Sequence, residues 1–369
     1  MYEHDDRVVM TLDAGGTNFV FSAIRGCREV VSPIRLDAEN DDSERCLQIL
    51  VKGFKMVEKV LGDEKPVAIS FAFPGPADYE HGIIGDLPNF PGFRGGVAMG
   101  PYLADIFGIP VFINNDGNLF AYGEAMAGAL PEINAKLAQA GSTKRYMNLL
   151  GLTIGTGFGG GAVIDGNLLT GDNGCGGDVW LMRNARYPNL ITEESVSIRA
   201  VKRVYHENAP GDSRDITPAE IFAIAEGNAE GDQLAAQAAF SELGRVAADA
   251  IIHSLDIIDG IVVIGGGVAN GWKYILPALV KEMNSGLATF SGEKFPCLQM
   301  KVFDLTTKEG LDGFLQDNSK VVKVPGTDRE VRYCNEKKTG ITFTHIGTSK
   351  AVSLGAYAFA LTQIDKRTL

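Results

Sequence analysis

The sequence is poor in cysteine and has no cluster of it. Its five cysteines are odd in number, form no CxC or CxxC pair and are scattered along the chain at Cys27, Cys46, Cys175, Cys297 and Cys334. No zinc cluster can be drawn from them, because structural zinc sites need closely spaced ligands. Scattered thiols are typical of a reducing compartment, so we expect a cytoplasmic protein.

The sequence also lacks a basic block. It has 34 Lys and Arg against 46 Asp and Glu, which gives a net charge of −12. This balance argues against nucleic acid as a partner, because neutralising phosphates needs a concentrated basic face. The first residues, MYEHDDR, contain no cationic region followed by an apolar core, so we expect no secretory leader.

No segment is predicted to cross a membrane. The uncharged stretch over residues 146–164 has nearly the required length, but it contains six glycines and two threonines. That composition indicates buried strands and turns. With nucleic acid and membranes excluded, a small molecule is the expected partner, and a second copy of the chain, as in a homodimer, is a further candidate.

Glycine is what the sequence has in excess. The 45 glycines make up about 12% of the chain, against about 7% in average proteins, and they occur in short clusters without a period. Such clusters mark tight turns where the backbone approaches a ligand. At 369 residues the chain is too long for one core of ordinary size, so two domains are expected.

The order of β-branched runs and helical periodicities predicts an α/β protein. A hairpin over 8–24 precedes a strand over 67–73, and a short strand over 111–113 leads into a helix from about 118 to 129. A second hairpin is expected over 148–164. Further helices are predicted over 46–61, 98–107, 193–205, 218–225, 233–258, 271–282 and 351–362, and a further strand over 261–264. The polar segment 307–340, with a hairpin around Pro325, is interpreted as an insertion.

Three glycine-rich loops follow predicted strands. In the first, Asp13-Ala14-Gly15-Gly16-Thr17, the glycines allow close backbone approach and the carboxylate can hold Mg²⁺ through water. Alone, it is also compatible with an ordinary hairpin turn. Together with the loops at Gly155-Thr156-Gly157 and Gly265-Gly266-Gly267, it favours a triphosphate held between two domains.

The second loop, within GTGFGG, matches the GxGxxG pattern of dinucleotide sites. Those sites need a helix to begin at the third glycine, whereas here residues 162–166 continue as a strand and a turn. We therefore favour a hairpin phosphate loop, whose backbone N–H groups face an anion. A plain structural turn is the remaining alternative.

Asn115 and Asp116 lie just past a short strand and just before a helix, where α/β proteins place ligand-facing groups. A carboxylate at that point can accept the proton of an attacking hydroxyl, which is the role of the base in phosphoryl transfer. Alternatively, Asp116 is the N-cap of the helix. The two roles are compatible, so both stay open.

Taken in order, these motifs resemble the ROK family of bacterial sugar kinases, a branch of the actin-like, ribonuclease H-like ATPase fold. The resemblance covers nearly the whole chain and is carried by DAGGT (13–17), FPGPAD (73–78), PNFPGF (88–93), INNDGN (113–118), GTGFGGG (155–161), GDNGCGGD (171–178), VIGGGVAN (263–270) and SLGAYAFAL (353–361). It implies two α/β domains with the nucleotide and sugar site in the cleft between them. The N-terminal domain would comprise residues 1–117 and about 350–369, and the C-terminal domain residues 118–349.

The resemblance also implies a role for each matching residue. The nucleotide and its phosphates would be bound by Asp13, Gly15, Gly16, Thr17, Gly155, Thr156, Gly157, Gly265, Gly266 and Gly267, with Asp13 also holding Mg²⁺ through water. Asp116 would be the catalytic base. The sugar would be contacted by Asn89, Asn115, Asp116, Asp178 and Glu193, with Glu194 as an alternative to Glu193.

The chain departs from the family where the family binds zinc. There the run that begins GxxGxAGE ends in Gly-His, and the histidine is both a zinc ligand and a sugar contact. Here Asp178 stands at the glutamate and Leu181 at the histidine, and the cysteine cluster is missing. The comparison implies ATP and Mg²⁺ as cofactors without zinc, and it leaves the sugar open. Repressors of the family carry an N-terminal helix-turn-helix, for which a first strand at Val8 leaves no room.

Three functions are compatible with the sequence. The favoured one is ATP-dependent phosphorylation of a hexose or hexose derivative, as in glucokinase or fructokinase. The alternatives are a sugar-binding regulator of the same fold without kinase activity, and an ATPase with a non-sugar partner. Asp116 argues against the regulator, because a pure binder needs no base. Asn89, Asn115 and Glu193 argue against the ATPase, because they match sugar contacts.

Overall fold

The structure consists of two α/β units. It is a computed structural model that describes residues 2–14, 18–39, 42–86, 92–268 and 271–368. The first unit comprises residues 1–131, 161–177 and 344–369, and the second comprises residues 132–160 and 178–343. No helix in the described part of the chain has both the length and the apolarity that crossing a membrane requires.

A five-stranded sheet in the order β3-β2-β1-β4-β7 forms the centre of the first unit. Its strands are β1 (Val8–Ala14), β2 (Asn18–Arg25), β3 (Arg28–Asp37), β4 (Pro66–Ala72) and β7 (Val111–Asn114), and a small pair is formed by β5 (Ala77–Asp78) and β6 (Ile83–Ile84). The predicted hairpin of β1 and β2 is confirmed, and β1, β4 and β7 run parallel. The sequence did not predict β3, whose Pro33 is tolerated because the strand lies at the sheet edge.

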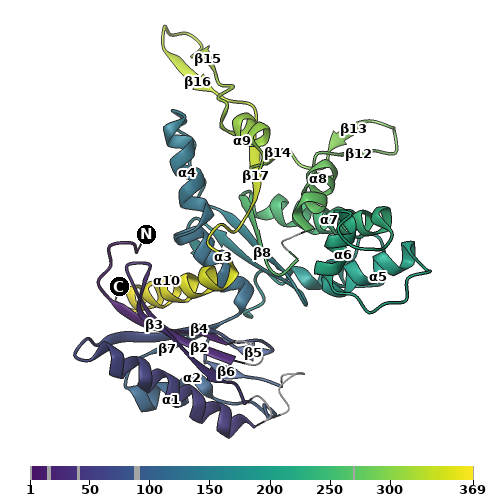
Figure 1. Ribbon diagram of the computed structural model, residues 1–369. Coiled ribbons are helices and arrows are strands. Elements are labelled where there is room, and N and C mark those ends of the chain that lie inside the picture. Colours follow the sequence, from purple (N-terminus) through teal and green to yellow (C-terminus); the bar gives the residue numbers. More distant parts are fainter. Residues whose placement is uncertain (1, 15–17, 40–41, 87–91, 269–270, 369) are drawn as a thin grey trace. The chain divides into compact units, whose positions relative to one another are not determined.

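Helices cover both faces of this sheet (Figure 1). One face packs against α1 (Ser43–Leu61) and α2 (Met99–Phe107), and the other against α10 (Thr348–Thr368). Strand β1 shows why: Met10 and Leu12 belong to the core with α1, whereas Val9 belongs to the core with α10. A parallel strand that is apolar on both sides is typical of a sheet covered on both faces.

The helix α3 (Asp116–Met126) packs closely against α10. A Cβ at Gly123 would lie 1.9 Å from the carbonyl oxygen of Ala351, and one at Gly355 would lie 1.8 Å from that of Leu119. Only glycine permits this approach of two helix backbones. The contact groups α3 with the first unit, whereas the sequence-based division ended the N-terminal domain at Gly117.

The second sheet has six strands in the order β10-β9-β8-β11-β17-β14. They are β8 (Leu149–Ile154), β9 (Phe158–Ile164), β10 (Asn167–Leu168), β11 (Ile261–Gly265), β14 (Lys301–Asp304) and β17 (Lys338–Phe343). Strands β8, β11, β17 and β14 are parallel neighbours. The second predicted hairpin is confirmed, since β8 and β9 are adjacent in the sheet.

Six helices accompany this sheet. They are α4 (Ala129–Gln139), α5 (Ile198–Asn208), α6 (Pro218–Ala225), α7 (Gln233–Ile258), α8 (Trp272–Met283) and α9 (Lys308–Leu315). The longest, α7, contacts α5, α6 and α8 and buries Leu243, Val246 and Ile251. Two hairpins project from the second unit (Figure 1): β12 (Gly286–Ala288) with β13 (Lys294–Pro296), and β15 (Lys320–Lys323) with β16 (Glu330–Tyr333). The predicted polar insertion therefore holds α9 and the second of these hairpins.

Candidate active site

The predicted site residues divide between the two units. Asp13, Asn115 and Asp116 belong to the first unit. The second contains Asp178 and Glu193, together with the glycine loops at 155–157 and 265–267. Gly15, Gly16, Thr17 and Asn89 lie outside the described residues.

Asp13 and the Asn115-Asp116 pair lie at one edge of the first sheet. The parallel register aligns Leu12 with Phe71 and Phe71 with Ile113, so the residues that follow Leu12 and Ile113 emerge at the same carboxyl edge. Two strand spacings separate β1 from β7, a distance of about 10 Å. In open α/β sheets this edge is where ligands bind.

Asparagines shape the passage from β7 into α3. The Oδ1 of buried Asn114 accepts hydrogen bonds from the N–H of Asn115 at 2.8 Å and from the Nδ2 of Asn118 at 3.1 Å. The Oδ1 of Asn115 accepts the N–H groups of Gly117 at 2.8 Å and Asn118 at 3.4 Å, so Asn115 is the N-cap. The alternative that Asp116 caps the helix is therefore wrong. Within the described structure, the Nδ2 of Asn115 has no hydrogen-bond partner.

Asp116 is the first residue of α3 and has no ion-pair partner among the described residues. Its Oδ1 accepts the N–H of Gly117 at 2.8 Å. Part of the side chain is exposed, yet desolvation by the surrounding protein raises the pKa of its carboxyl above the ordinary value, and the Gly117 hydrogen bond opposes this only in part. A carboxylate with a raised pKa and an accessible oxygen is suited to accepting a proton.

Two cavities of the first unit adjoin these residues. One, of about 440 Å³, is lined by Asp13 together with Thr11, Ser22 and Lys350. The other, of about 690 Å³, is lined by Asn114, Asn118 and the loops at 77–81 and 170–174. Both volumes fall within the range of about 300–1,000 Å³ typical of small-molecule sites.

In the second unit, the two glycine loops lie next to each other. Strands β8 and β11 are parallel with Thr153 opposite Gly265, so the loops that follow them emerge at the same edge. A Cβ at Gly155 would lie 4.0 Å from the backbone nitrogen of Gly267, and one at Gly267 would meet no atom within 4 Å. The N–H groups of Thr156, Gly157 and Gly267 donate to no described residue. The loops thus present open space and unpartnered donors, which fits an anionic ligand.

Glu193 holds the first of these loops in place. Its Oε2 accepts the N–H of Phe158 at 2.9 Å, and a Cβ at Gly157 would lie only 2.7 Å from that oxygen. Its Oε1 accepts the Nη2 of Arg199 at 2.8 Å. Arg199 also bonds the Oε1 of Glu194 at 2.7 Å and the carbonyl oxygen of Thr156 at 3.2 Å. Arg199 could not be identified from the sequence, since a single arginine in a predicted helical segment carries no pattern.

The helix predicted over 193–205 is wrong at its start. Residues Thr192–Glu194 form a 3-10 turn, and α5 begins only at Ile198. The hydroxyl of Ser197 donates to the carbonyl oxygen of Glu193 at 2.8 Å, and the N–H of Ile198 donates to that of Gly155 at 2.8 Å. The second of these bonds is a long-range contact, and it takes precedence over the helical periodicity of the segment.

Asp178 precedes a second 3-10 turn, Val179–Leu181, which packs against the turn of Glu193. Its side chain is exposed, and desolvation raises the pKa of its carboxyl, while a hydrogen bond with Trp180 opposes that change. Leu181, which stands at the position of the family's histidine, is 54% exposed, so its side chain is not part of the core. Asp178 therefore presents a carboxylate beside the turn that carries Glu193.

Between these two turns, one buried asparagine organises the chain. The Nδ2 of Asn184 donates to Ser195 Oγ at 2.8 Å and to the Ile191 carbonyl at 3.2 Å, and its Oδ1 accepts the N–H groups of Arg186 and Tyr187, each at 3.0 Å. Asn184 is fully buried. Over the described ranges, no group of three or more His, Cys, Asp or Glu side chains is arranged to hold a metal ion. Asn184 could not be predicted from the sequence, because an isolated asparagine gives no motif.

Two α/β units, each with a β-hairpin in its sheet and polar loops at a sheet edge, define the actin-like, ribonuclease H-like ATPase fold. Residues 9–315 match the sequence model of the ROK family. The chain belongs to this family, which confirms the resemblance seen in its motifs.

The structure is similar to the crystal structure of a glucokinase from Parabacteroides distasonis, with a TM-score of 0.89 and 58% identity over 98% of this chain and 99% of that one. Among curated proteins, a glucokinase from Thermotoga maritima is 29% identical over 46% of this chain and 48% of its own length. An N-acetyl-D-glucosamine kinase from Photobacterium profundum is 31% identical over 45% of this chain and 50% of its own length. The chain thus spans about half the length of the curated relatives it matches.

Proposed function

We propose that this protein is a cytoplasmic kinase that transfers the γ-phosphoryl group of ATP to a hexose, with glucose as the first substrate to test. The observation that carries the proposal is Asp116, a carboxylate without an ion-pair partner in the described structure, held where the parallel strands β1, β4 and β7 have their carboxyl ends. The 58% identity with a glucokinase over nearly the whole chain supports the choice of sugar. The five cysteines, all free, fit a reducing compartment.

The residues present fit ATP and Mg²⁺. The N–H groups of Thr156, Gly157 and Gly267 are donors without a described partner, and the space beside Gly267 is open. Donors of this kind bind phosphate oxygens. The carboxylate of Asp13 lines a cavity and is a hard oxygen ligand of the kind that Mg²⁺ binds directly or through water. Bound ATP-Mg²⁺ supplies the phosphoryl group and neutralises its charge.

The chain's own residues then have separate tasks. Asp116 accepts the proton of the sugar hydroxyl that attacks, and its raised pKa makes that acceptance more favourable near neutral pH. Thr156, Gly157 and Gly267 donate hydrogen bonds to phosphate oxygens, which stabilises the charge that develops there. Glu193 fixes the loop that carries two of these donors through its bond to Phe158.

On the sugar side, we infer that the Nδ2 of Asn115, which has no partner among the described residues, donates to a hydroxyl while its Oδ1 caps α3. Between the two glutamates, we favour Glu193 over Glu194 as the sugar contact, because among the described residues Glu193 is held by two partners whereas the side chain of Glu194 bonds to Arg199 alone. Asp178, beside the turn of Glu193, is the third candidate contact. Asn89 stays a prediction, as do Gly15, Gly16 and Thr17 in the phosphate loop.

A coupled assay of ADP release tests the proposal. Turnover is measured with ATP and Mg²⁺ alone and then with glucose, N-acetylglucosamine, fructose, allose, mannose and N-acetylmannosamine. We expect glucose to raise ADP release far above the rate with ATP alone. Sugar binding by calorimetry with no sugar-dependent ADP release would instead support the sugar-binding regulator and overturn the kinase assignment.

A further inference from the structure

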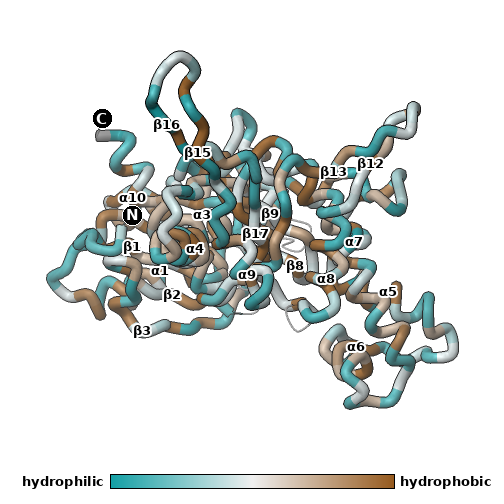
Figure 2. Tube along the Cα trace, turned by 90° about the horizontal axis from the view of Figure 1, so that it is seen from above, coloured by the Kyte–Doolittle hydropathy of each residue, from teal (hydrophilic) through white to brown (hydrophobic). Residues whose placement is uncertain are grey.

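The cavity of about 690 Å³ in the first unit, which we call the loop cavity, is lined by none of the predicted sugar contacts that the structure describes. Two surface loops, residues 77–81 and 170–174, form much of its lining. The C-terminal half of α10, which becomes hydrophilic toward the end of the chain (Figure 2), adds Phe359 and Gln363. Three buried residues at the passage from β7 into α3 complete it, namely Ile113, Asn114 and Asn118. The loop cavity is therefore a space beside the turn of Asp116 that the proposed reaction does not use.

One buried group that lines the loop cavity lacks a partner. Asn118 is 4% exposed, and its Nδ2 donates to the Oδ1 of Asn114 at 3.1 Å. Its own Oδ1 accepts no hydrogen bond in the described structure. Leaving a buried acceptor unpaired is costly. A hydroxyl group of a ligand supplies the missing donor, directly or through one ordered water.

The two loops are held in shape by their own hydrogen bonds. In the first loop, the Oδ1 of Asp78 accepts the N–H of His81 at 3.2 Å, and its Oδ2 lies 2.8 Å from the Nδ1 of His81. In the second, the N–H of Gly176 donates to the carbonyl oxygen of Thr170 at 3.0 Å. The walls of the cavity are thus formed without a ligand, which lowers the entropy that binding would cost.

The polar side chains of the loop cavity define the class of ligand. Glu80 and Asp172 have no hydrogen-bond or ion-pair partner among the described residues, and no lysine or arginine lines the cavity, so a phosphate or another anion is disfavoured. Thr170, Asn173 and Gln363 add a hydroxyl and two amides. Carboxylates only accept hydrogen bonds and an ammonium group only donates them, whereas a hydroxyl does both. A neutral polyhydroxylated ligand therefore matches all of these groups.

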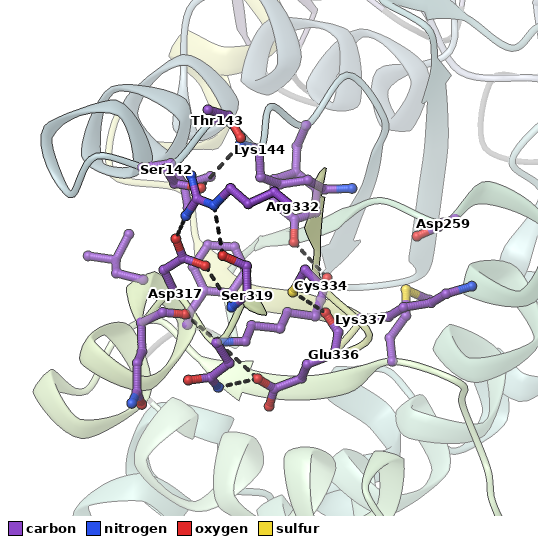
Figure 3. A pocket seen from close by; sticks show the side chains of 18 residues that line it. Ser142, Thr143, Lys144, Asp259, Asp317, Ser319, Arg332, Cys334, Glu336 and Lys337 are labelled. Atoms are coloured by element: carbon purple, nitrogen blue, oxygen red, sulfur yellow. Dashed lines mark hydrogen bonds and ion pairs between the residues drawn. The ribbon is translucent and has the colours of Figure 1, made fainter. Parts of the chain in front are cut away.

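The cavity of about 450 Å³ in the second unit differs from the loop cavity (Figure 3). Several of its polar groups are bonded within the protein. Arg332 pairs with Asp317, and the Nζ of Lys338 donates to the carbonyl oxygens of Gly313 at 2.9 Å and Gln316 at 2.7 Å. In the described part of the chain, no buried side-chain atom without a partner belongs to a residue that lines this cavity. The missing donor is thus a feature of the loop cavity.

We propose that the loop cavity is a second binding site for a saccharide, and that its occupation stabilises the turn of Asp116. Asn114 and Asn118 connect the cavity to that turn. The Oδ1 of Asn114 accepts the N–H of Asn115 at 2.8 Å, and the N–H of Asn118 donates to the Oδ1 of Asn115 at 3.4 Å. A ligand that donates to Asn118 thus acts next to the residue that precedes the base. The effect on catalysis rests on the proposed function, whereas the binding does not.

Equilibrium dialysis with labelled glucose, a neutral saccharide, counts the sites on the full chain. The double variant Glu80→Leu, Asp172→Leu removes two acceptors from the cavity, and we expect it to bind the second glucose at least tenfold more weakly. At a concentration that saturates the wild type, it should bind one glucose fewer per chain. The matched control Asp63→Leu, Asp105→Leu makes the same change of charge at exposed residues outside the cavity and should bind like the wild type. Glucose that the double variant still binds reports on the site of the proposed reaction, so a failure of that function is seen separately.

Hydrogen exchange measured by mass spectrometry tests the coupling to Asp116. At saturating glucose, we expect the N–H groups of residues 115–118 to exchange at least threefold more slowly in the wild type than in the double variant, because only the wild type fills the loop cavity. Circular dichroism checks that each variant is folded. Equal numbers of bound glucose in the wild type and the double variant would overturn the proposal, and so would binding of protonated glucosamine in the cavity without binding of glucose. Equal exchange rates would overturn the coupling to Asp116.

Discussion

Two carboxylates among the predicted site residues, one in each unit, are held in opposite ways. Asp116, in the first unit, has no ion-pair partner among the described residues, and desolvation raises its pKa. Glu193, in the second unit, has both oxygens engaged, one by the N–H of Phe158 and the other by Arg199. A carboxylate free of cations retains basicity, whereas one that is bonded at both oxygens is fixed in position. The difference assigns the chemical step to Asp116 and the positioning to Glu193.

The residues around Asp116 and Glu193 fit these two roles. The N-cap that α3 needs is supplied by Asn115, which leaves Asp116 available for a ligand. At Glu193 the chain supplies Arg199 six residues later, in the first turn of α5, and Gly157 leaves room for the carboxylate. An ion-pair partner for Asp116 would make its carboxylate a weaker base. Loss of the partners of Glu193 would leave its side chain mobile.

Replacing Asp116 with Asn should have the largest effect. The change keeps the size of the side chain but removes its basicity, and loss of a general base costs about 10²- to 10⁴-fold in rate. We therefore expect kcat for the best sugar to fall at least about a hundredfold. Because Asn115 is the cap, the melting temperature and the sugar affinity by calorimetry should change little. A variant with kcat near that of the wild type would remove Asp116 from the chemical step.

The pH dependence of kcat/KM is a second test of the difference between Asp116 and Glu193. Asp116 acts as a base only when ionised, and its raised pKa means that it is protonated at a higher pH than an ordinary aspartate near 3.9. Activity should therefore fall with decreasing pH through that raised pKa. The same shift favours the protonated form in the folded protein, so this residue's contribution to stability is present at low pH and is lost as pH rises.

Thermal unfolding measured over the same pH series is the control for this profile. If activity decreases toward acid while the melting temperature does not fall, titration of the base explains the loss. An acidic limb at the pKa of an unperturbed aspartate would contradict the role of desolvation at Asp116.

The sequence predicted the parts of the site that rest on local patterns. Glycine clusters after β-branched runs predicted the hairpins β1–β2 and β8–β9. The polar pair Asn115-Asp116 after a short strand predicted the sheet edge where Asp116 lies. Contacts between distant residues could not be predicted in this way. Arg199 and Asn184 act through partners on other turns of the chain, and neither has a spacing that marks it. The start of α5 was misplaced for the same reason, since the N–H of Ile198 donates to the distant carbonyl of Gly155.

Replacing Gly157 with Ala should raise the KM for ATP. The new Cβ would lie 2.7 Å from Glu193 Oε2, so the carboxylate must move away from the N–H of Phe158. A hydrogen bond to a charged group contributes about 1.5–3 kcal/mol, and 1.4 kcal/mol is a tenfold change in affinity. We expect an increase of about tenfold or more in steady-state kinetics. Gly211→Ala, where a Cβ meets no atom within 4 Å, is the matched control and should leave the KM unchanged.

Replacing Arg199 with Met should have a smaller effect, because the arginine is 45% exposed and water screens its ion pairs. An exposed pair contributes about 0–1 kcal/mol, so we expect the KM for sugar to rise about fivefold or less, with kcat nearly constant. Arg199→Lys keeps the charge but cannot bridge Glu193, Glu194 and the Thr156 carbonyl together. Its KM should lie between those of the wild type and Arg199→Met. Equal effects of the two variants would show that charge alone is needed.

Treatment with a zinc chelator should have the smallest effect of these tests, because we expect no change in activity or stability. The segment between Asp178 and Glu193 is held by Asn184, whose amide makes four hydrogen bonds in the described structure. These hydrogen bonds hold the segment without a metal ion. A zinc chelator should therefore leave both turnover and the melting temperature unchanged. Removal of Mg²⁺, in contrast, should abolish turnover. Asn184→Ala should lower the melting temperature, because buried groups that lose a partner cost about 1–3 kcal/mol each. Zinc at one atom per chain by elemental analysis would contradict this assignment, and so would a melting temperature that falls with the chelator.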